Sequence, residues 1–85
     1  MSHVKHAPER NRFELDLPGG PATLSYERDD GRLVLLHTGV PETHEGRGHG
    51  SALVQAAVDH ARAEGLEVVP LCSFARAYLE GKGEG

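Results

Sequence analysis

The chain has 85 residues, which suffice for one domain with one small hydrophobic core. Its formal net charge of −4 argues against a nucleic-acid-binding function, because that function needs clustered Lys and Arg side chains that neutralise phosphates. Its apolar runs are shorter than the roughly 20 residues that cross a bilayer, and its N-terminus lacks the apolar core of a signal peptide. We therefore expect a cytoplasmic protein without a membrane partner. The one cysteine cannot form an internal disulfide.

The first half of the chain predicts three antiparallel strands. Residues 1–11 are polar and irregular, with room for a short edge strand over 3–5. Residues 12–17 and 22–27 alternate between apolar and polar side chains on either side of a Pro-Gly-Gly-Pro turn, so they predict a hairpin of half-buried strands. After an Asp-Asp-Gly turn, the nearly continuous apolar run over 32–38 is typical of a central strand covered on both faces.

A helix is predicted next, because the period of the apolar residues rises to about 3.6 after residue 50. One stripe of this helix is apolar, and it consists of Leu53, Val54, Ala57 and Ala61. Small alanines on the packed side let a helix lie close to a sheet, and Gly65 supplies the left-handed residue that commonly ends a helix. The pattern therefore predicts a helix packed on the three strands.

The last quarter of the chain predicts one more strand and a short helix. The strand, LEVVPL over 66–71, is reached through the long helix, so it should run parallel to the strand over 32–38 in a right-handed βαβ unit. Residues 73–80 predict the short helix, with Ser73 as its cap. The residues of this helix that we expect to face inward are Phe74, Ala77 and Tyr78. The fold class is α/β (α+β), with a mixed sheet.

A glycine-rich loop joins the strand over 32–38 to the long helix. Gly46, Gly48 and Gly50 remove the Cβ atoms that would keep a ligand from the backbone, and a helix that begins there presents unpaired N–H groups and a partial positive charge. The loop is therefore a candidate anion site, and a turn or packing role for the glycines is the simpler alternative. A nucleotide-triphosphate loop is excluded, since no lysine follows Gly50, and the GxGxG spacing fits the dinucleotide fingerprint poorly.

The segment 37–80 resembles a known family. An HT-x-VP motif, a glycine loop that opens a helix and a VVPLCSF strand end resemble the short, single-domain members of the GCN5-related N-acetyltransferase (GNAT) superfamily. The resemblance covers residues 12–80 and implies a minimal GNAT-like, acyl-CoA-binding domain there. Residues 1–11 are then an N-terminal arm or edge strand, and residues 81–85 a flexible tail.

The resemblance implies that acetyl-coenzyme A binds between the two parallel strands and the glycine loop. Loop amides would grip its diphosphate, and strand amides over 36–40 would pair with its pantetheine arm. The cofactor-binding residues so implied are Leu36, Thr38, Val40, Glu45, Gly46, Arg47, Gly48, His49, Gly50 and Ser51. Glu45 departs from the family, which has Arg or Gln at this position. Its carboxylate would repel a diphosphate unless it turns to solvent or Arg47 compensates.

Three residues are candidates for acyl-transfer chemistry, which needs a polarised carbonyl, a deprotonated amine and a proton for the departing thiolate. Cys72, at the end of the last strand, is a candidate acetyl-accepting nucleophile or else a small buried apolar residue. His37 is a candidate base or a packed strand histidine, and Tyr78 resembles the family's proton-donating tyrosine or is core. In the loop, His44 and His49 touch phosphate or acceptor, or are simply exposed. The histidines lack the ligand spacing of a zinc site, so no metal is expected.

These features indicate an N-acetyltransferase that moves an acetyl group from acetyl-CoA to an amine of a small molecule or a protein. The alternative is a non-catalytic module that binds coenzyme A or a partner protein, which Glu45 and the small size favour. The resemblance also implies that the helices and late strands that wall the acceptor pocket in larger relatives are missing. We therefore expect an acceptor site that is shallow, open to a protein substrate, or shared with a second subunit of a homodimer.

Overall fold

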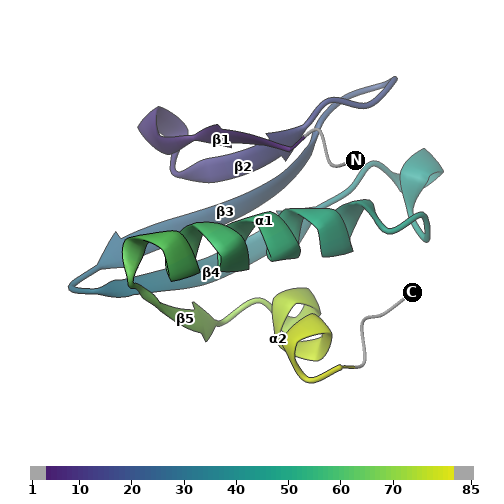
Figure 1. Cartoon of the computed structure of the whole chain (residues 1–85). Coiled ribbons are helices and arrows are strands. Elements are labelled where there is room, and N and C mark those ends of the chain that lie inside the picture. The colour runs from purple at the N-terminus through teal and green to yellow at the C-terminus, as the bar shows by residue number, and fades with distance from the viewer. Residues whose placement is uncertain (1–3, 82–85) are drawn as a thin grey trace.

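A five-stranded sheet forms the frame of the computed structural model, which describes residues 4–81 (Figure 1). The strands lie side by side in chain order, the first four antiparallel to their neighbours and β5 parallel to β4, as predicted. The strands are β1 Lys5–Ala7, β2 Arg12–Leu15, β3 Ala22–Asp29, β4 Arg32–Gly39 and β5 Glu67–Pro70. The helical elements are the 3₁₀ turns η1 Pro8–Arg10 and η2 Glu42–His44 and the α-helices α1 His49–Glu64 and α2 Ser73–Leu79.

The bounds of the first two strands differ from the prediction by a few residues. The edge strand β1 covers Lys5–Ala7 rather than 3–5, and β2 ends at Leu15, before the predicted residue 17. His3, which the prediction includes in the edge strand, lies outside the described residues. The residues of the expected tail after Gly81 lie outside them too.

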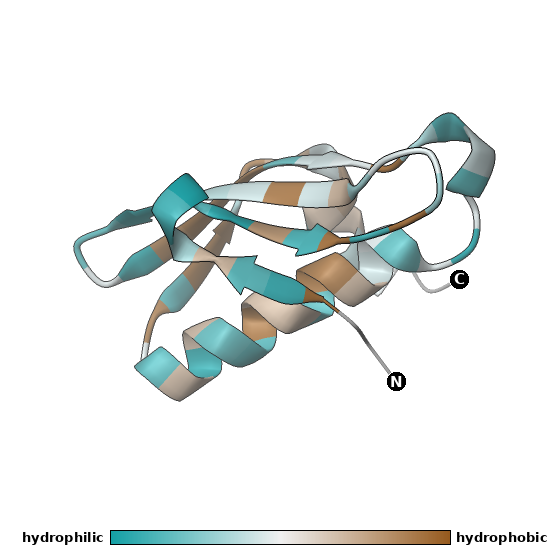
Figure 2. Ribbon diagram, turned by 90° about the horizontal axis from the view of Figure 1, so that it is seen from above, coloured by the Kyte–Doolittle hydropathy of each residue, from teal (hydrophilic) through white to brown (hydrophobic). Residues whose placement is uncertain are grey.

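The helix α1 lies along one face of the sheet (Figure 2). One layer of apolar side chains fills the space between them. From α1 it contains the predicted stripe, Leu53, Val54, Ala57 and Ala61, with each residue at most 1% exposed. The strands contribute Phe13, Leu15, Ala22, Leu24, Tyr26, Leu33 and Leu35. The small alanines let the helix axis approach the sheet, and the helix ends at Gly65, which has the predicted left-handed conformation with φ of 70°.

The strand β4 is not buried on both faces, which corrects the prediction. Leu35 is fully buried, whereas Leu36 is 43% exposed. The apolar layer under α1 covers one face of the sheet, so Val34, on the other face, is only half-buried. A β-bulge follows, because Tyr26 pairs with Leu35 but Ser25 pairs with His37, so that Leu36 is an extra residue between the two pairs. The bulge turns the end of β4 away from the regular alternation of its first half.

The short helix α2 packs beside α1 near the end of β5 (Figure 1). Its buried residue is Ala75, whereas Phe74 is 39% exposed, so the predicted inward side of this helix is wrong at Phe74. Tyr78 is half-buried, and its hydroxyl donates a hydrogen bond of 2.6 Å to Gln55 Oε1 on α1. The two helices are therefore joined by a polar contact as well as by apolar packing.

Candidate functional site

The two parallel strands separate at their C-terminal ends. The Cα pairing of β4 with β5 ends at Leu35 and Pro70, and β4 then continues to Gly39 (Figure 1). The N–H groups of the next two residues, Leu71 and Cys72, both donate to Leu35 O, at 2.9 and 3.0 Å. The last residues of β4 therefore extend past β5 without pairing to it, which is the strand arrangement expected for a bound pantetheine arm.

The loop between β4 and α1 depends on glycine for its shape. Gly46 and Gly48 have φ of 80° and 81°, which residues with a Cβ rarely adopt. Gly48 is the N-cap of α1, and the first hydrogen bond of the helix runs from Ala52 N–H to Gly48 O at 3.0 Å. The amides of His49 and Gly50 precede that bond, so they lie at the open end of the helix, where its dipole favours an anion.

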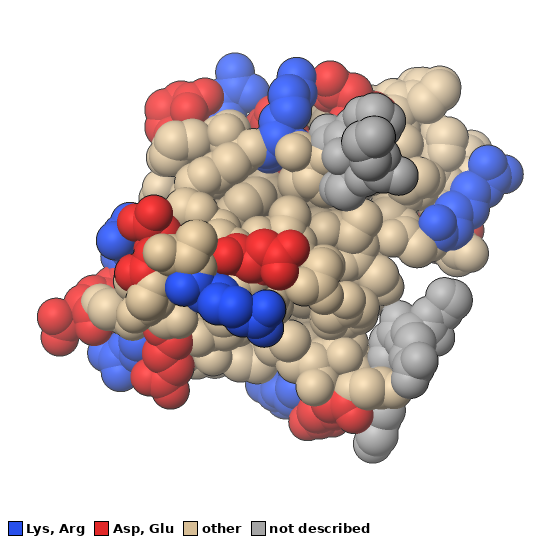
Figure 3. All heavy atoms as spheres, viewed as in Figure 1, with Lys and Arg blue, Asp and Glu red and all other residues tan. Residues whose placement is uncertain are grey.

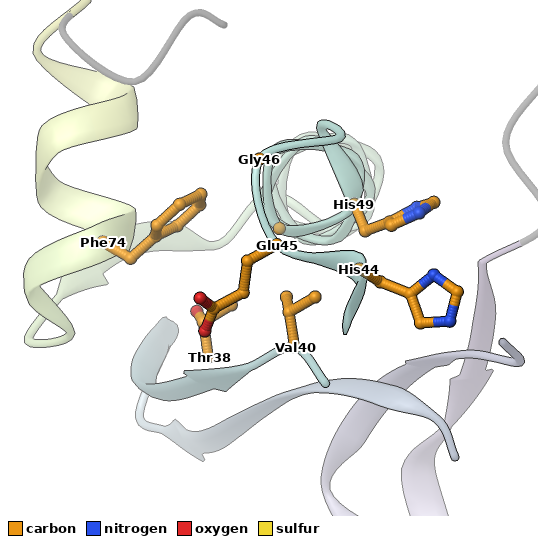
Figure 4. Close-up of a pocket in the computed structure, with 8 residues that line it drawn as sticks. Thr38, Val40, His44, Glu45, Gly46, His49 and Phe74 are labelled. Carbon is orange, nitrogen blue, oxygen red and sulfur yellow. The ribbon is translucent and has the colours of Figure 1, made fainter. Parts of the chain in front are cut away.

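A histidine fixes this loop to the turn between β2 and β3. His44 Nε2 lies 2.8 Å from Pro18 O, and because a carbonyl only accepts, Nε2 is the donor. The rings of His44 and His49 meet edge to face with centroids 5.9 Å apart. Both rings point away from Phe74 (Figure 4).

A cavity of about 260 Å³ lies under the loop (Figure 4). Its walls come from β4, the loop, the first turn of α1 and the first turn of α2. The lining residues are Thr38, Val40, His44, Glu45, Gly46, His49, Gly50 and Phe74. Among the residues predicted to bind cofactor, those outside this lining are Leu36, Arg47, Gly48 and Ser51. Phe74 has no sequence signal for this site, because its approach to the loop depends on how α2 packs on α1.

Glycine is required for different reasons at the three glycine positions of the loop. A Cβ on Gly46 or Gly48 would meet nothing within 4 Å, so only their left-handed backbone requires glycine. A Cβ on Gly50 would lie 2.7 Å from Cζ and 2.9 Å from Cε1 of Phe74. The packing role that was the simpler alternative therefore applies at Gly50, where an aromatic ring occupies the space.

Thr38 connects the cavity to Cys72. Thr38 Oγ1 and Cys72 Sγ are 3.3 Å apart, within hydrogen-bonding range for sulfur. Burial alone would raise the pKa of the Cys72 thiol, but the Thr38 hydroxyl and backbone groups of Ala75 and Phe74 outweigh it, so the pKa is lowered. Cys72, rather than the predicted Ser73, is the N-cap residue of α2. The lowered pKa makes the thiolate of Cys72 easier to form.

Comparison with known proteins identifies the family. A family model for the GCN5-related N-acetyl-transferases matches residues 12–84. The chain belongs to this family. Protein NATD1 of Mus musculus is 35% identical to it, with 91% of this chain and 73% of the relative covered. Protein NATD1 of Gallus gallus is also 35% identical with the same coverage, and that of Homo sapiens is 35% identical, with 91% and 71% covered.

Glu45 occupies the position at which the resemblance to the GNAT superfamily implies Arg or Gln. Its side chain extends from the loop toward Thr38, and its carboxylate lies in the cavity (Figure 4). Arg47 is exposed and does not line the cavity. A negative charge therefore faces the cavity.

His37 lies on the opposite face of β4 from the cavity. Thr38 pairs with Leu24, which is fully buried under α1, whereas the neighbouring His37 pairs with Ser25 on the other face of the sheet. The His37 ring is exposed, and its Nε2 is 3.5 Å from the point that a Cβ on Gly39 would occupy. Thr38 and His37 therefore approach the end of β4 from opposite sides of the sheet.

Tyr78 faces α1 rather than the cavity under the loop. Besides its hydrogen bond to Gln55, it lines a separate shallow groove of about 380 Å³ between the two helices. The other residues of that groove are Gln55, Val58, Arg62, Leu79 and Gly81. Donation of a proton by Tyr78 to a thiolate near Cys72 would first require the bond to Gln55 to break.

The described residues carry neither a membrane-spanning helix nor a metal-binding cluster. Among residues 4–81, no helix has both the length and the apolar composition to cross a bilayer. That part of the chain also holds no group of three His, Cys, Asp or Glu side chains arranged for a metal ion. On the face shown in Figure 3, Lys and Arg side chains are interspersed with Asp and Glu, both around the rim and near the middle of the face. That face carries no continuous basic patch of described residues.

Proposed function

We propose that the protein is an N-acetyltransferase that moves an acetyl group from acetyl-CoA to an amine. The observation that carries this proposal is the continuity between the cavity under the glycine loop and Cys72, through the 3.3 Å contact with Thr38. A donor held at the loop by its diphosphate would have its thioester at the ends of the parallel strands. Membership of the GNAT family supports the same reaction.

The residues around the cavity suit the different parts of acetyl-CoA. Gly46 and Gly48 leave the loop backbone uncovered, and the open end of α1 favours a diphosphate. The end of β4 beyond Leu35 offers backbone groups to the amides of a pantetheine arm, and Val40 and Phe74 offer apolar surface. When bound, acetyl-CoA supplies the activated acyl group.

Two routes to the product use different residues of this chain. In the direct route, His37 accepts the proton of the attacking amine, whose nitrogen bonds to the acetyl carbon while the carbon–sulfur bond breaks and the thiolate leaves. In the covalent route, Cys72 Sγ first bonds to the acetyl carbon while the carbon–sulfur bond to CoA breaks and the CoA thiolate leaves. The amine nitrogen then bonds to the acetyl carbon, the bond to Cys72 Sγ breaks, and the proton of the amine passes to the released Cys72 thiolate. The lowered pKa of Cys72 favours the covalent route.

We infer that the amine acceptor approaches the exposed face of β4 on which His37 lies and reaches the thioester where β4 and β5 separate, beyond Leu35 and Pro70. A small-molecule amine and an amine on a protein both fit an open face of this kind. A second subunit of a homodimer is one way to add walls to such a site. We place this reaction in the cytoplasm, with neither a nucleic acid nor a membrane as partner.

Calorimetry with acetyl-CoA tests the donor site. Gly46→Ala should weaken binding by roughly tenfold, because the added Cβ drives the loop out of its left-handed conformation and misdirects its amides. Gly31→Ala is the matched control, since Gly31 has a similar φ of 83° but lies in the turn at the other end of β4. Equal affinities for the two variants would contradict the proposed site.

Catalysis is tested separately from binding. Release of the CoA thiol in the presence of candidate amines measures turnover. Acid quench and mass spectrometry should detect an acetyl adduct on Cys72 in the wild type and none in Cys72→Ala if the covalent route operates. Turnover without an adduct selects the direct route, and in that case His37→Gln should remove most of it.

The second candidate function is a non-catalytic module that binds coenzyme A or a partner protein. The Glu45 carboxylate in the cavity favours it, because repulsion of the diphosphate lowers the affinity for the acyl donor on which catalysis depends. Measurable binding of acetyl-CoA with no thiol release for any amine would select this function over the transferase.

A further inference from the structure

Phe74 is the aromatic residue in the wall of the cavity under the loop. It lies in the first turn of α2, and 39% of its surface is exposed, although the adjacent Ala75 is fully buried. Figure 4 shows the ring reaching from α2 toward the loop, over the same space that Thr38 and Val40 border. The exposed part of the ring is thus an apolar surface presented to the cavity.

Gly50 leaves the space that this ring occupies. The ideal Cβ of a residue at position 50 would lie 2.7 Å from Cζ, 2.9 Å from Cε1 and 3.3 Å from Cε2 of Phe74. Such distances are far shorter than van der Waals contact, so any side chain at this position would push the ring out of place. The pair Gly50 and Phe74 therefore sets the width of the cavity between the two helices.

Phe74 stands beside the path from the loop to Cys72. Thr38 and Phe74 both line the cavity, and Thr38 contacts the sulfur of Cys72 at 3.3 Å. An acyl group directed from the loop toward Cys72 would thus pass the ring. The cavity volume of about 260 Å³ lies below the roughly 300 to 1,000 Å³ of sites that enclose a whole small ligand, so little spare volume remains beside the ring.

We propose that Phe74, seated on Gly50, is the specificity-determining residue that restricts the donor to short acyl thioesters. This inference rests on the proposed function, since it requires that an acyl-CoA binds under the loop. A ring in this position excludes a longer alkyl chain by its bulk. A smaller side chain at position 74 admits that chain and lets it gain apolar contacts in the cavity.

Calorimetry with acetyl-CoA and octanoyl-CoA tests the inference. The wild type should bind acetyl-CoA more tightly, and Phe74→Ala should shift the ratio of the two dissociation constants by roughly tenfold or more toward octanoyl-CoA. Phe74→Leu, which keeps part of the bulk, should shift the ratio less. Leu79→Ala is the matched control, because Leu79 is a similarly exposed apolar residue of α2, at 41%, outside this cavity. It should leave the ratio unchanged.

A double-mutant cycle tests whether Gly50 and Phe74 act through their contact with each other. Gly50→Ala in the wild type should displace Phe74 and weaken acetyl-CoA binding. In the Phe74→Ala background the same substitution should have a much smaller effect, because the ring that it strikes is gone. Equal effects of Gly50→Ala in the two backgrounds would show that the pair does not set the cavity width and would overturn the inference.

The outcomes separate this inference from the proposed function. An unchanged ratio in Phe74→Ala, with acetyl-CoA still bound, overturns the inference and leaves the proposed function standing. Failure of the wild type to bind either thioester overturns both. Thermal unfolding of each variant reports whether it folds, and if Phe74→Ala does not fold, the ratio in Phe74→Leu decides in its place.

Discussion

The two ends of α1 both carry a left-handed glycine, yet they are completed differently. At the C-terminal end, with Gly65 at φ of 70°, the N–H of Leu66 donates to Ala61 O at 2.7 Å and that of Gly65 to Arg62 O at 3.3 Å. At the N-terminal end, Gly48 has φ of 81° and has no side chain with which to cap the helix. The same residue in the same conformation thus closes one end and leaves the other open toward the cavity.

The comparison teaches that a glycine signal must be interpreted with its neighbours. Beyond Gly65 the chain enters β5 directly, and the carbonyls of the last turn are satisfied by the backbone. Before Gly48 the chain comes from β4 through η2, and the end of β4 pairs with β3 but not with β5. The N-terminal end of α1 therefore lies beside a strand end with free space on one side. The first arrangement serves stability, and the second suits ligand binding.

The largest expected effect comes from Leu53→Ala, which should destabilise α1 as a whole and therefore affect both of its ends. Leu53 is fully buried in the helix, and removal of its side chain leaves a cavity that should cost roughly 2 to 5 kcal/mol of unfolding free energy. Urea unfolding measures this loss, and acetyl-CoA affinity should fall with it. A loss below about 1 kcal/mol would show that the middle of the helix does not anchor its ends.

A pair of matched glycine variants sharpens the comparison. Gly48→Ala and Gly65→Ala should each cost about 1 kcal/mol of stability, because each forces alanine into the left-handed region. Only Gly48→Ala should also weaken acetyl-CoA binding, since only Gly48 shapes the end of α1 at which the cavity-lining residues His49 and Gly50 lie. Unfolding curves and calorimetry on the same samples give both quantities. Weakened binding in Gly65→Ala to the same extent would contradict the assignment of roles.

The charge at the open end gives a smaller effect. Glu45→Gln removes the carboxylate that lies in the cavity and should tighten acetyl-CoA binding by roughly fivefold, the effect of one partly screened charge interaction. Glu45→Arg should tighten it further. Calorimetry at low and at physiological salt should show the gain shrinking as salt rises. Unchanged affinity in both variants would refute repulsion of the diphosphate by Glu45.

The smallest effect is expected near the closed end, where α1 packs on β1. The centroids of the His60 and His6 rings are 4.4 Å apart, and His6 also stacks on Phe13 at 4.4 Å. Burial and the charge of His60 lower the pKa of His6 from 6.5, against the opposing effect of Glu9 and Glu64. As the pH falls below 6.5, the unfolded chain therefore binds the proton before the folded protein does, and stability declines toward the lower, folded pKa.

Urea midpoints at about pH 7.5 and about pH 5.5 measure this contribution. The wild type should lose stability at the lower pH, and His6→Phe, which keeps a ring to stack on Phe13, should lose less. Identical losses in the two proteins would assign the pH dependence to other groups.

The periodic parts of the fold could be predicted from the sequence, because the burial of a residue there follows from its place in a repeat. Leu24 and Leu53 are buried where the alternation and the helical period put them. The bulge at Leu36 could not be predicted, because an uninterrupted apolar run carries no mark of the register shift between β3 and β4. In α2, a helix of only seven residues gives too little periodicity to rank Ala75 above Phe74.

The candidate site follows the same division. One contiguous motif of the sequence predicts several residues of the cavity, which are Thr38, Val40, Gly46 and Gly50. The sequence gives no comparable signal for contacts that join distant segments. The seat of Phe74 on Gly50 and the contact of Thr38 with Cys72 arise only when α2 packs on α1 and β5 pairs with β4. Site residues that come together only through tertiary packing can therefore be identified only from the structure.

The outer side of β5 has a consequence for self-association. The N–H groups of Glu67 and Leu71 donate toward β4, so the N–H positions of the alternate residues, Val68 and Pro70, face away from the sheet. Because proline has no N–H, an incoming strand would find only one donor along this border. Edge-to-edge polymerisation through β5 is thereby discouraged, as in other natural sheets that protect their margins with proline. Any symmetric dimer should accordingly use a different surface.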